Sequence, residues 1–132
     1  MQLGNTGENI ILDYLLGNTA TGFANVEIGL SPDSSFNEDS FTEVSGNGYA
    51  RVAVSNNKTT WGNASGGALT KSIDFTFPTA SGGDWGNVYV AMVFEPATNN
   101  LLCWANITGA PKNITDGDTF TLTSGGVSFT AD

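Results

Sequence analysis

Carboxylates are the side chains of this sequence with the greatest capacity for chemistry, because it contains 13 Asp and Glu residues and no histidine. Six of them lie in two polar stretches: Asp33, Glu38, Asp39 and Glu43 in the first, Asp116 and Asp118 in the second. Such groups can ligate calcium or form the acid and base pair of a glycosidase. The spacing matches no EF-hand, and separation along the chain does not fix separation in space. Solvated acidic loops are therefore the favoured interpretation, and a carboxylate glycosidase is the remote alternative.

The possible nucleophiles have no base beside them. Serine and threonine are abundant, but the chain contains neither a Gly-X-Ser-X-Gly segment nor a histidine to accept a proton. Cys103 is the one cysteine and stands in an apolar run, residues 101–105, which is typical of a buried structural thiol. The sequence therefore predicts no catalytic residue, no metal ligand and no cofactor, and a protein that acts through surface contacts rather than as an enzyme.

The charge balance argues against two classes of partner. Four basic residues against 13 acidic ones give a formal net charge of −9, which repels nucleic-acid phosphates and anionic membranes. No apolar run approaches the ~20 residues of a membrane span. The opening residues 1–4 lack the basic and apolar stretches of a secretory signal, so synthesis in the cytoplasm is expected.

The apolar pattern predicts one all-β domain over residues 1–132, a β-sandwich or jelly-roll-like barrel with one short N-terminal α-helix. The helix lies within residues 1–17. Asn5 is its expected cap with Glu8 three residues on, and Gly17 with Asn18 forms its stop. The helix either plugs one end of the β core or docks on a neighbouring subunit.

Strand-like runs follow the helix, separated by Gly- and Asn-rich turns. They cover residues 26–30, 49–55, 73–77, 88–94, 101–107, 120–122 and 127–129. Residues 88–94 are apolar at nearly every position, which suits a central strand covered on both faces. The last two runs are expected to form a terminal hairpin. The predicted core comprises Ile73, Phe75, Val90, Met92, Phe94, Leu102, Phe120 and Leu122.

Apolar side chains in the N-terminal segment and in the long polar loops, residues 32–48 and 56–69, are candidates for an interface core. They are Leu3, Ile10, Ile11, Tyr14, Phe36, Phe41 and Trp61. Trp61 could equally fold back over the open end of the sandwich, whereas Trp85, beside a central strand, is expected in the core. The acidic chain should bind a neutral or basic surface, with an on-rate that falls as salt rises.

Several segments in a fixed order resemble a known family. They are residues 5–16 (NTGENIILDYLL), 48–54 (GYARVAV), 74–80 (DFTFPTA) with 84–86 (DWG), and 111–112 (PK) with 117–120 (GDTF). Together they resemble small virion proteins of tailed bacteriophages, often labelled tail-fibre proteins, to which head decoration (cement) proteins are similar in type. The resemblance spans nearly the whole chain and implies a structural, non-enzymatic role in the virion.

Two structural roles compete within that resemblance. Because the chain has neither a heptad stretch nor a shaft repeat, its small form favours a capsid decoration protein that binds the outer face of the capsid lattice. The alternative is a tail-fibre module that binds a host glycan or receptor. The implied partners are the major capsid protein or other virion proteins, and copies of the chain itself as a homo-oligomer, with a trimer plausible.

Overall fold

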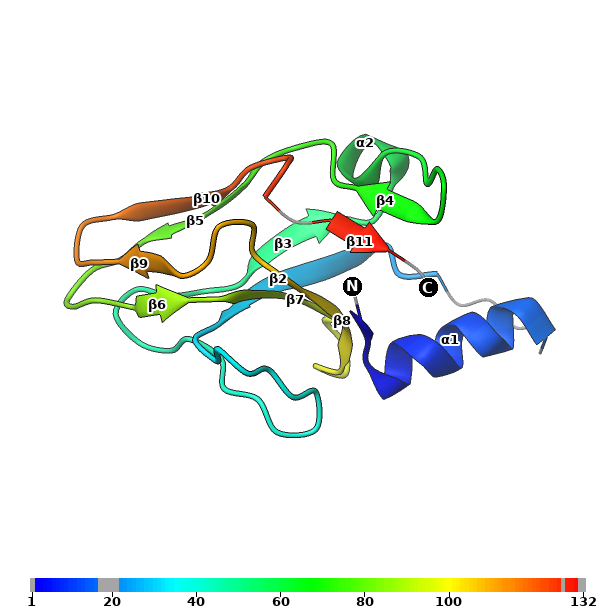
Figure 1. Cartoon of the computed structure of the whole chain (residues 1–132), viewed down its shortest axis with the longest axis horizontal. Coiled ribbons are helices and arrows are strands. Elements are labelled where there is room, and N and C mark those ends of the chain that lie inside the picture. Colours follow the sequence, from blue (N-terminus) through cyan, green and yellow to red (C-terminus); the bar gives the residue numbers. More distant parts are fainter. Residues whose placement is uncertain (1, 17–21, 127, 131–132) are drawn as a thin grey trace.

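A five-stranded antiparallel sheet is the largest element of the computed structural model, which describes residues 2–16, 22–126 and 128–130. Its strands run in the order β1-β8-β7-β2-β3 (Figure 1). Their bounds are β1 Gln2–Leu3, β8 Leu101–Asn106, β7 Val90–Phe94, β2 Asn25–Ser31 and β3 Val52–Ser55. The long strands β2, β7 and β8 lie at the centre, and the two shortest strands form the edges.

Three two-stranded pairs complete the β structure. They are β5 Phe75–Thr79 with β10 Thr119–Leu122, β4 Ala68–Thr70 with β11 Ser128–Thr130, and β6 Gly86–Val88 with β9 Lys112–Ile114. The pair β5–β10 lies above the sheet in Figure 1, and one apolar core joins the two layers. The all-β prediction is therefore confirmed, and the described strands form no closed barrel.

The N-terminal helix α1 spans Asn5–Leu16, as predicted. Its cap differs from the prediction, because the carbonyl of Gly4 accepts the first helical hydrogen bond, from Glu8 N at 3.0 Å. Asn5 instead directs its side-chain amide toward Asp39 Oδ1 at 3.4 Å, in the long loop. Of the described helices, neither is long and apolar enough to cross a membrane.

A second helix, α2 Lys58–Trp61, stands where the sequence indicated only a loop. Asn57 caps it, since its Oδ1 accepts hydrogen bonds from Thr59 N and Thr60 N at 3.0 and 3.1 Å. One turn is too short to produce an apolar period, so only the capping residue could have indicated it.

Strand β7 is buried on both faces, as its unbroken apolar run predicted. Ala91 and Val93 point into the main core between the two layers. Val90, Met92 and Phe94 point to the opposite face and form a second, smaller core. The segment between β2 and β3, residues 32–51, covers that second core and so has a structural function.

The predicted core is confirmed with one exception. Phe75, Val90, Met92, Phe94, Leu102 and Leu122 are buried, and Phe120 is half-buried against the core. Ile73 is 42% exposed, so its assignment was wrong. Strand β5 begins only at Phe75, and the buried position before it belongs to Lys71.

The predicted terminal hairpin is also wrong. Strand β10 pairs with β5, with Leu122 opposite Phe75, whereas β11 pairs with β4, with Phe129 opposite Leu69. The turn between β10 and β11 is held by the residue that precedes β5, because Ser124 N donates to Asp74 Oδ1 at 2.8 Å. Two pairings distant in sequence thus replace one local pairing.

Candidate interaction sites

The loop aromatics proposed for an interface pack on the sheet. Phe36 and Phe41 stack with their ring centroids 5.4 Å apart. Phe36 also lies 4.6 Å from the ring of Trp104, and Phe41 lies 6.0 Å from that of Phe94. Both side chains are half-buried and form the roof of the second core. Any interface role therefore falls to their outer edges and stays a prediction.

An ion pair ties the same loop to the sheet. Arg51 donates to both carboxylate oxygens of Glu43, from Nε at 2.7 Å and from one terminal nitrogen at 2.6 Å. The guanidinium lies 3.5 Å from the ring centroid of Phe94, a cation–π contact. The hydrogen bonds to Glu43 are the chief cause of the raised pKa of Arg51. The Arg51–Glu43 pair therefore acts as a clamp on the second core.

Tyr49 extends this clamp into the sheet. Its hydroxyl donates to Glu43 Oε1 at 2.9 Å and accepts from Leu30 N at 2.8 Å. Burial, together with the nearby Glu43 carboxylate, raises the pKa of the Tyr49 phenol. Both carboxylate oxygens of Glu43 thus accept hydrogen bonds from the protein itself. Such a carboxylate is poorly placed to serve as the acid or base of a glycosidase.

Two further carboxylates of the acidic stretches, Asp33 and Asp118, accept hydrogen bonds within their own loops. Asp33 Oδ2 accepts from Thr42 N at 2.6 Å, and Asp118 Oδ2 accepts from Thr115 N and Oγ1, both at 2.8 Å. The hydrogen bonds from Thr115 lower the pKa of Asp118. Across the described residues, no group of three acidic or cysteine side chains is arranged to hold a metal ion.

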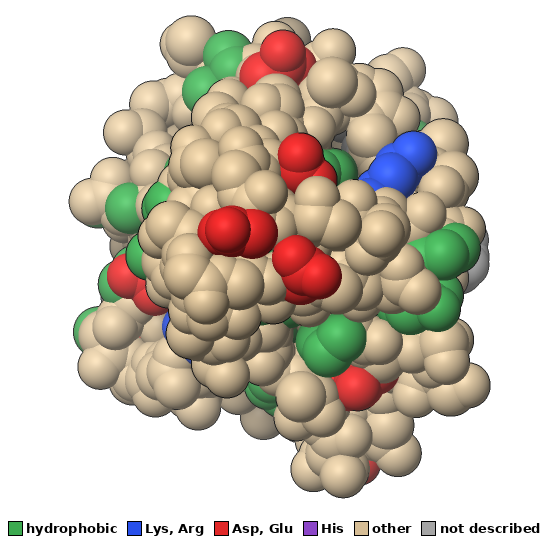
Figure 2. All heavy atoms as spheres, turned by 90° about the vertical axis from the view of Figure 1, so that its left-hand side faces the viewer, with side chains coloured by type: hydrophobic (Ala, Val, Ile, Leu, Met, Phe, Trp, Pro, Cys, Tyr) green, Lys and Arg blue, Asp and Glu red, His purple; other side chains and the backbone are tan. Residues whose placement is uncertain are grey.

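One end of the molecule is polar and acidic (Figure 2). The turns between β5 and β6 and between β9 and β10 meet there, and Asp116 N donates to Asp84 Oδ1 at 2.8 Å. Asn47, from the long loop, joins them through Nδ2 to the carbonyl of Asp84 at 2.9 Å. Figure 2 shows acidic side chains near the centre of this face and apolar side chains mainly toward its margin.

The opposite end carries α1, whose faces differ. Ile10 is half-buried and packs against the main core, and Leu3 is half-buried in β1. Ile11 is exposed, and so are the two leucines of the outer face, Leu12 at 54% and Leu16 at 84%. The side chain of Tyr14 lies outside the described residues. The helix thus covers β8 on one side and presents apolar side chains on the other.

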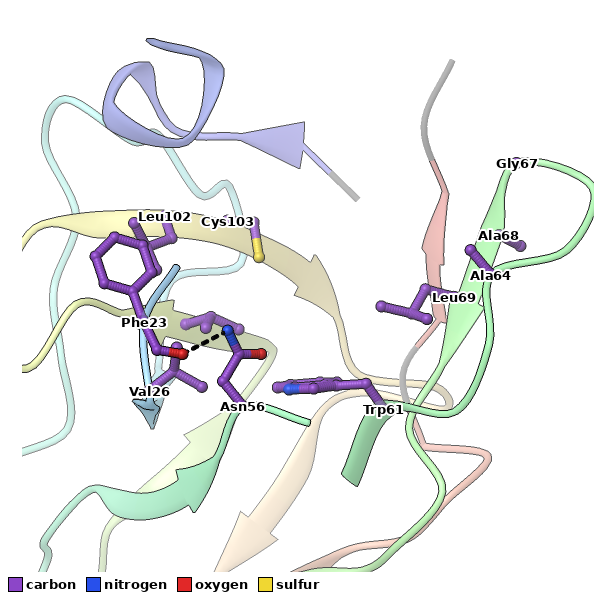
Figure 3. Close-up of a pocket in the computed structure, with 11 residues that line it drawn as sticks. Phe23, Val26, Asn56, Trp61, Ala64, Gly67, Ala68, Leu69, Leu102 and Cys103 are labelled. Carbon is purple, nitrogen blue, oxygen red and sulfur yellow. Dashed lines mark hydrogen bonds between the residues drawn. The ribbon is translucent and has the colours of Figure 1, made fainter. Parts of the chain in front are cut away.

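An apolar pocket of about 360 Å³ opens at this end (Figure 3). One wall comes from the sheet, with Leu102 and Cys103 of β8, and the other from α2 and β4, with Trp61 and Leu69. The remaining lining residues are Phe23, Val26, Asn56, Ala64, Gly67, Ala68 and Val93. Burial raises the pKa of the Cys103 thiol to about 12, in agreement with a structural thiol.

The side chains of the two loop tryptophans, Trp61 and Trp85, are both buried. Trp85 is buried, as predicted, and its Nε1 donates to the carbonyl of Asn47 at 2.9 Å. Trp61 is also buried, with its ring 5.6 Å from that of Phe75 in an edge-to-face arrangement. The structure thus places Trp61 in the wall of the pocket, and an interface role for it stays a prediction.

Lys71 is a buried basic residue that the sequence pattern did not reveal. It is 1% exposed, and its ammonium donates to the carbonyls of Ile73, at 2.9 Å, and of Leu122. The ring centroid of Phe75 lies 4.8 Å from Nζ. Burial lowers the pKa of Lys71. Its contacts are with backbone oxygens and an aromatic face, so it joins β5 to β10 and has a structural function.

A family model described as Gp80, podophage GP4 fiber I protein gp80, matches residues 2–130. No curated protein matches the chain. The match covers α1, the long loops and every strand, and it confirms the resemblance to virion proteins labelled as tail-fibre proteins. It supports the fibre alternative and gives no support to capsid decoration.

Proposed function

Because this chain belongs to the family of the podophage GP4 fiber I protein gp80, we propose that it is a non-enzymatic structural module of the phage fibre. A fibre family implies a component of the virion. The observation that carries the proposal is the family match over residues 2–130. Almost the whole chain therefore aligns with the family.

The chemistry of the described residues supports a role without catalysis. Glu43 is engaged by Arg51 and Tyr49, and the acidic residues Asp33 and Asp118 accept hydrogen bonds from backbone amides of their own turns. Carboxylates that stabilise loops in this way contribute to shape rather than to turnover. The function therefore rests on which surfaces the fold presents.

Those surfaces differ between the two ends, and this polarity supports attachment at one of them. The end with α1 offers exposed Ile11, Leu12 and Leu16 beside an apolar pocket. The other end offers polar turns and carboxylates (Figure 2). Interface cores are apolar and depleted in charge. We therefore assign virion attachment to the α1 end, with the acidic end facing solvent.

Host glycan binding by a stacked tryptophan receives less support. Trp61 and Trp85 are both buried, at 8% exposure each. Sugar recognition also needs several polar groups converging on the site. In the pocket, Asn56 is the polar side chain, and its amide already donates to the carbonyl of Phe23 at 3.0 Å.

The location of the protein on the virion tests the fibre assignment. We expect an antibody or a fused tag to label the tail in electron micrographs, at few copies per particle. Labelling spread over the head, at hundreds of copies, would instead identify a capsid decoration protein and overturn the assignment.

Attachment through the α1 end has its own test. Particles that lack the protein can be titrated with wild type, with Ile11→Asn, and with Ser34→Asn as a control at an exposed loop position. We expect Ile11→Asn to reduce occupancy and Ser34→Asn to leave it unchanged. Equal occupancy by all three proteins would contradict attachment through α1. If the partner is basic, binding should also weaken as salt rises.

A further inference from the structure

We propose that the apolar pocket between β8 and β4 receives the exposed face of α1, Leu12 and Leu16, from a second copy of this chain. The pocket (Figure 3) and the helix α1 (Figure 1), with its exposed leucines, lie at the same end of the molecule. The inference concerns self-association through the pocket, Leu12 and Leu16, and it goes beyond the proposed attachment to another virion protein. That attachment then depends on Ile11, which is exposed beside these leucines.

The chemistry of the pocket selects an apolar occupant. Its walls are formed by Phe23, Trp61, Leu69 and Leu102, and no lining residue carries a charge. Asn56 uses its amide within the protein. A sugar or phosphate would find few partners there, whereas aliphatic side chains would replace water at no cost in hydrogen bonds.

The helix supplies side chains of that kind at the required spacing. Leu12 and Leu16 are four residues apart, so they lie on one face, about 6 Å apart along the axis. Pairs at this spacing are the usual anchors of a helix in an apolar groove. The volume of about 360 Å³ exceeds the roughly 150 Å³ that holds a benzene molecule in an apolar cavity. There is therefore room for both leucine ends.

Charge favours a second copy at this end above any other face. Two molecules with a net charge of −9 repel each other, and the acidic end would bring carboxylates together (Figure 2). No residue that lines the pocket carries a charge, so a helix seated there does not face a carboxylate of the pocket. Because both lie at one end, copies can exchange helices in a closed symmetric assembly that uses each pocket and each helix once.

Sedimentation velocity over a wide concentration range tests the proposal with substitutions that leave the net charge unchanged. The helix variant is Leu12→Gln with Leu16→Gln, at exposed positions. The pocket variants are Ala64→Gln, at an exposed lining position, and Ala68→Gln. Ser34→Gln is the matched control in an exposed loop position. Far-UV and near-UV circular dichroism checks that each variant is folded.

We expect wild type and Ser34→Gln to associate, and the helix variant and each pocket variant to raise the dissociation constant about tenfold or more, since burying one leucine is worth at least that factor. A mixture of the helix variant with a pocket variant should recover association, because one intact helix still meets one intact pocket. Wild-type association should strengthen as salt screens the repulsion, opposite to binding of a basic virion partner.

Each other outcome overturns the proposal. Undiminished association of the pocket variants would indicate helix–helix pairing, and undiminished association of the helix variant would indicate pocket–pocket pairing. A mixture without recovery would show that the two surfaces do not meet. A monomeric wild type whose stability falls in both classes of variant would mean that the pocket holds the chain's own helix. A monomer at every concentration would leave the fibre assignment standing, since that depends on the location of the protein on the virion.

Discussion

Gly7 of α1 faces the backbone carbonyl oxygen of Leu102 in β8 so closely that a Cβ on Gly7 would lie 2.1 Å from that oxygen. Gly4 has a similar contact, where a Cβ would lie 2.7 Å from the carbonyl oxygen of Leu101. The start of the helix therefore rests directly on the backbone of the strand. Glycine at both positions sets the distance between α1 and the sheet.

Gly7→Ala should destabilise the protein, although alanine is the better helix former by about 1 kcal/mol. The added methyl meets a backbone atom that cannot rotate away, so the helix must move, at a cost of about 1–3 kcal/mol. Urea denaturation measures the change. Gly125→Ala is the control, because a Cβ there meets nothing within 4 Å. Equal stability of the two variants would show that the helix yields freely.

Phe75→Ala and Ile73→Ala should differ sharply in stability. Phe75 is 2% exposed and its ring contacts that of Trp61, so its removal should cost about 3–5 kcal/mol. Ile73, at 42% exposure, should cost less than about 1 kcal/mol. Chemical denaturation of both variants checks the pair. A similar loss at both positions would mean that β5 begins before Phe75.

Arg51→Lys should release the loop that covers the second core. Lysine cannot reproduce the two hydrogen bonds to Glu43 or stack its charge flat on Phe94, so we expect a loss of about 1–3 kcal/mol. Proteolysis within residues 32–51 should also become faster. Lys58→Arg, a charge-preserving exchange at an exposed position of α2, is the control. A proteolysis rate unchanged by Arg51→Lys would show that the aromatic roof alone holds the loop.

Lys71→Met should cost about 1–3 kcal/mol, because the carbonyls of Ile73 and Leu122 lose their donor inside the protein. The loss should depend on pH. The pKa of Lys71 is lowered by burial, so between that value and its ordinary 10.5 the unfolded state binds the proton more strongly than the folded state. The contribution of Lys71 to stability therefore rises with pH across that window.

The measurement is the difference in unfolding free energy between wild type and Lys71→Met from neutral pH to about pH 10.5. Tyr49 and Cys103 have raised pKa values, so each makes total stability fall as pH rises above its unfolded pKa. Both groups are present in the two proteins, and their effects cancel in the difference. A difference that stays flat or shrinks with rising pH would contradict the lowered pKa.

The sequence predicted the parts of the fold that repeat over several residues. Five consecutive apolar residues in β7 could indicate a strand buried on both faces, because only a central strand tolerates that pattern. Alternation at Val26, Ile28 and Leu30 likewise placed β2 correctly. Such patterns depend on the side chains of a single strand and need no knowledge of the partner strand.

Features that depend on contacts between distant segments escaped prediction. Nothing near Lys71 in the sequence indicates that the carbonyl of Leu122, on another strand, will accept a hydrogen bond from its ammonium. The hairpin predicted after Leu122 was wrong for the same reason, since β10 pairs with β5 and β11 pairs with β4 instead of with each other. The pocket is a further case, because Cys103 and Trp61 are 42 positions apart in the sequence (103 − 61). Both line the pocket only because the two layers of the fold pack together.

The short edges of the five-stranded sheet limit how copies of this protein can join. Strand β1 has two residues and β3 has four, so each edge exposes few unpaired backbone amides and carbonyls. Strand addition from a neighbouring molecule needs a longer template than this. Many copies in one assembly should therefore not aggregate through edge-to-edge strand pairing. Side-chain fit, rather than a continuous sheet across chains, would decide which neighbours are accepted.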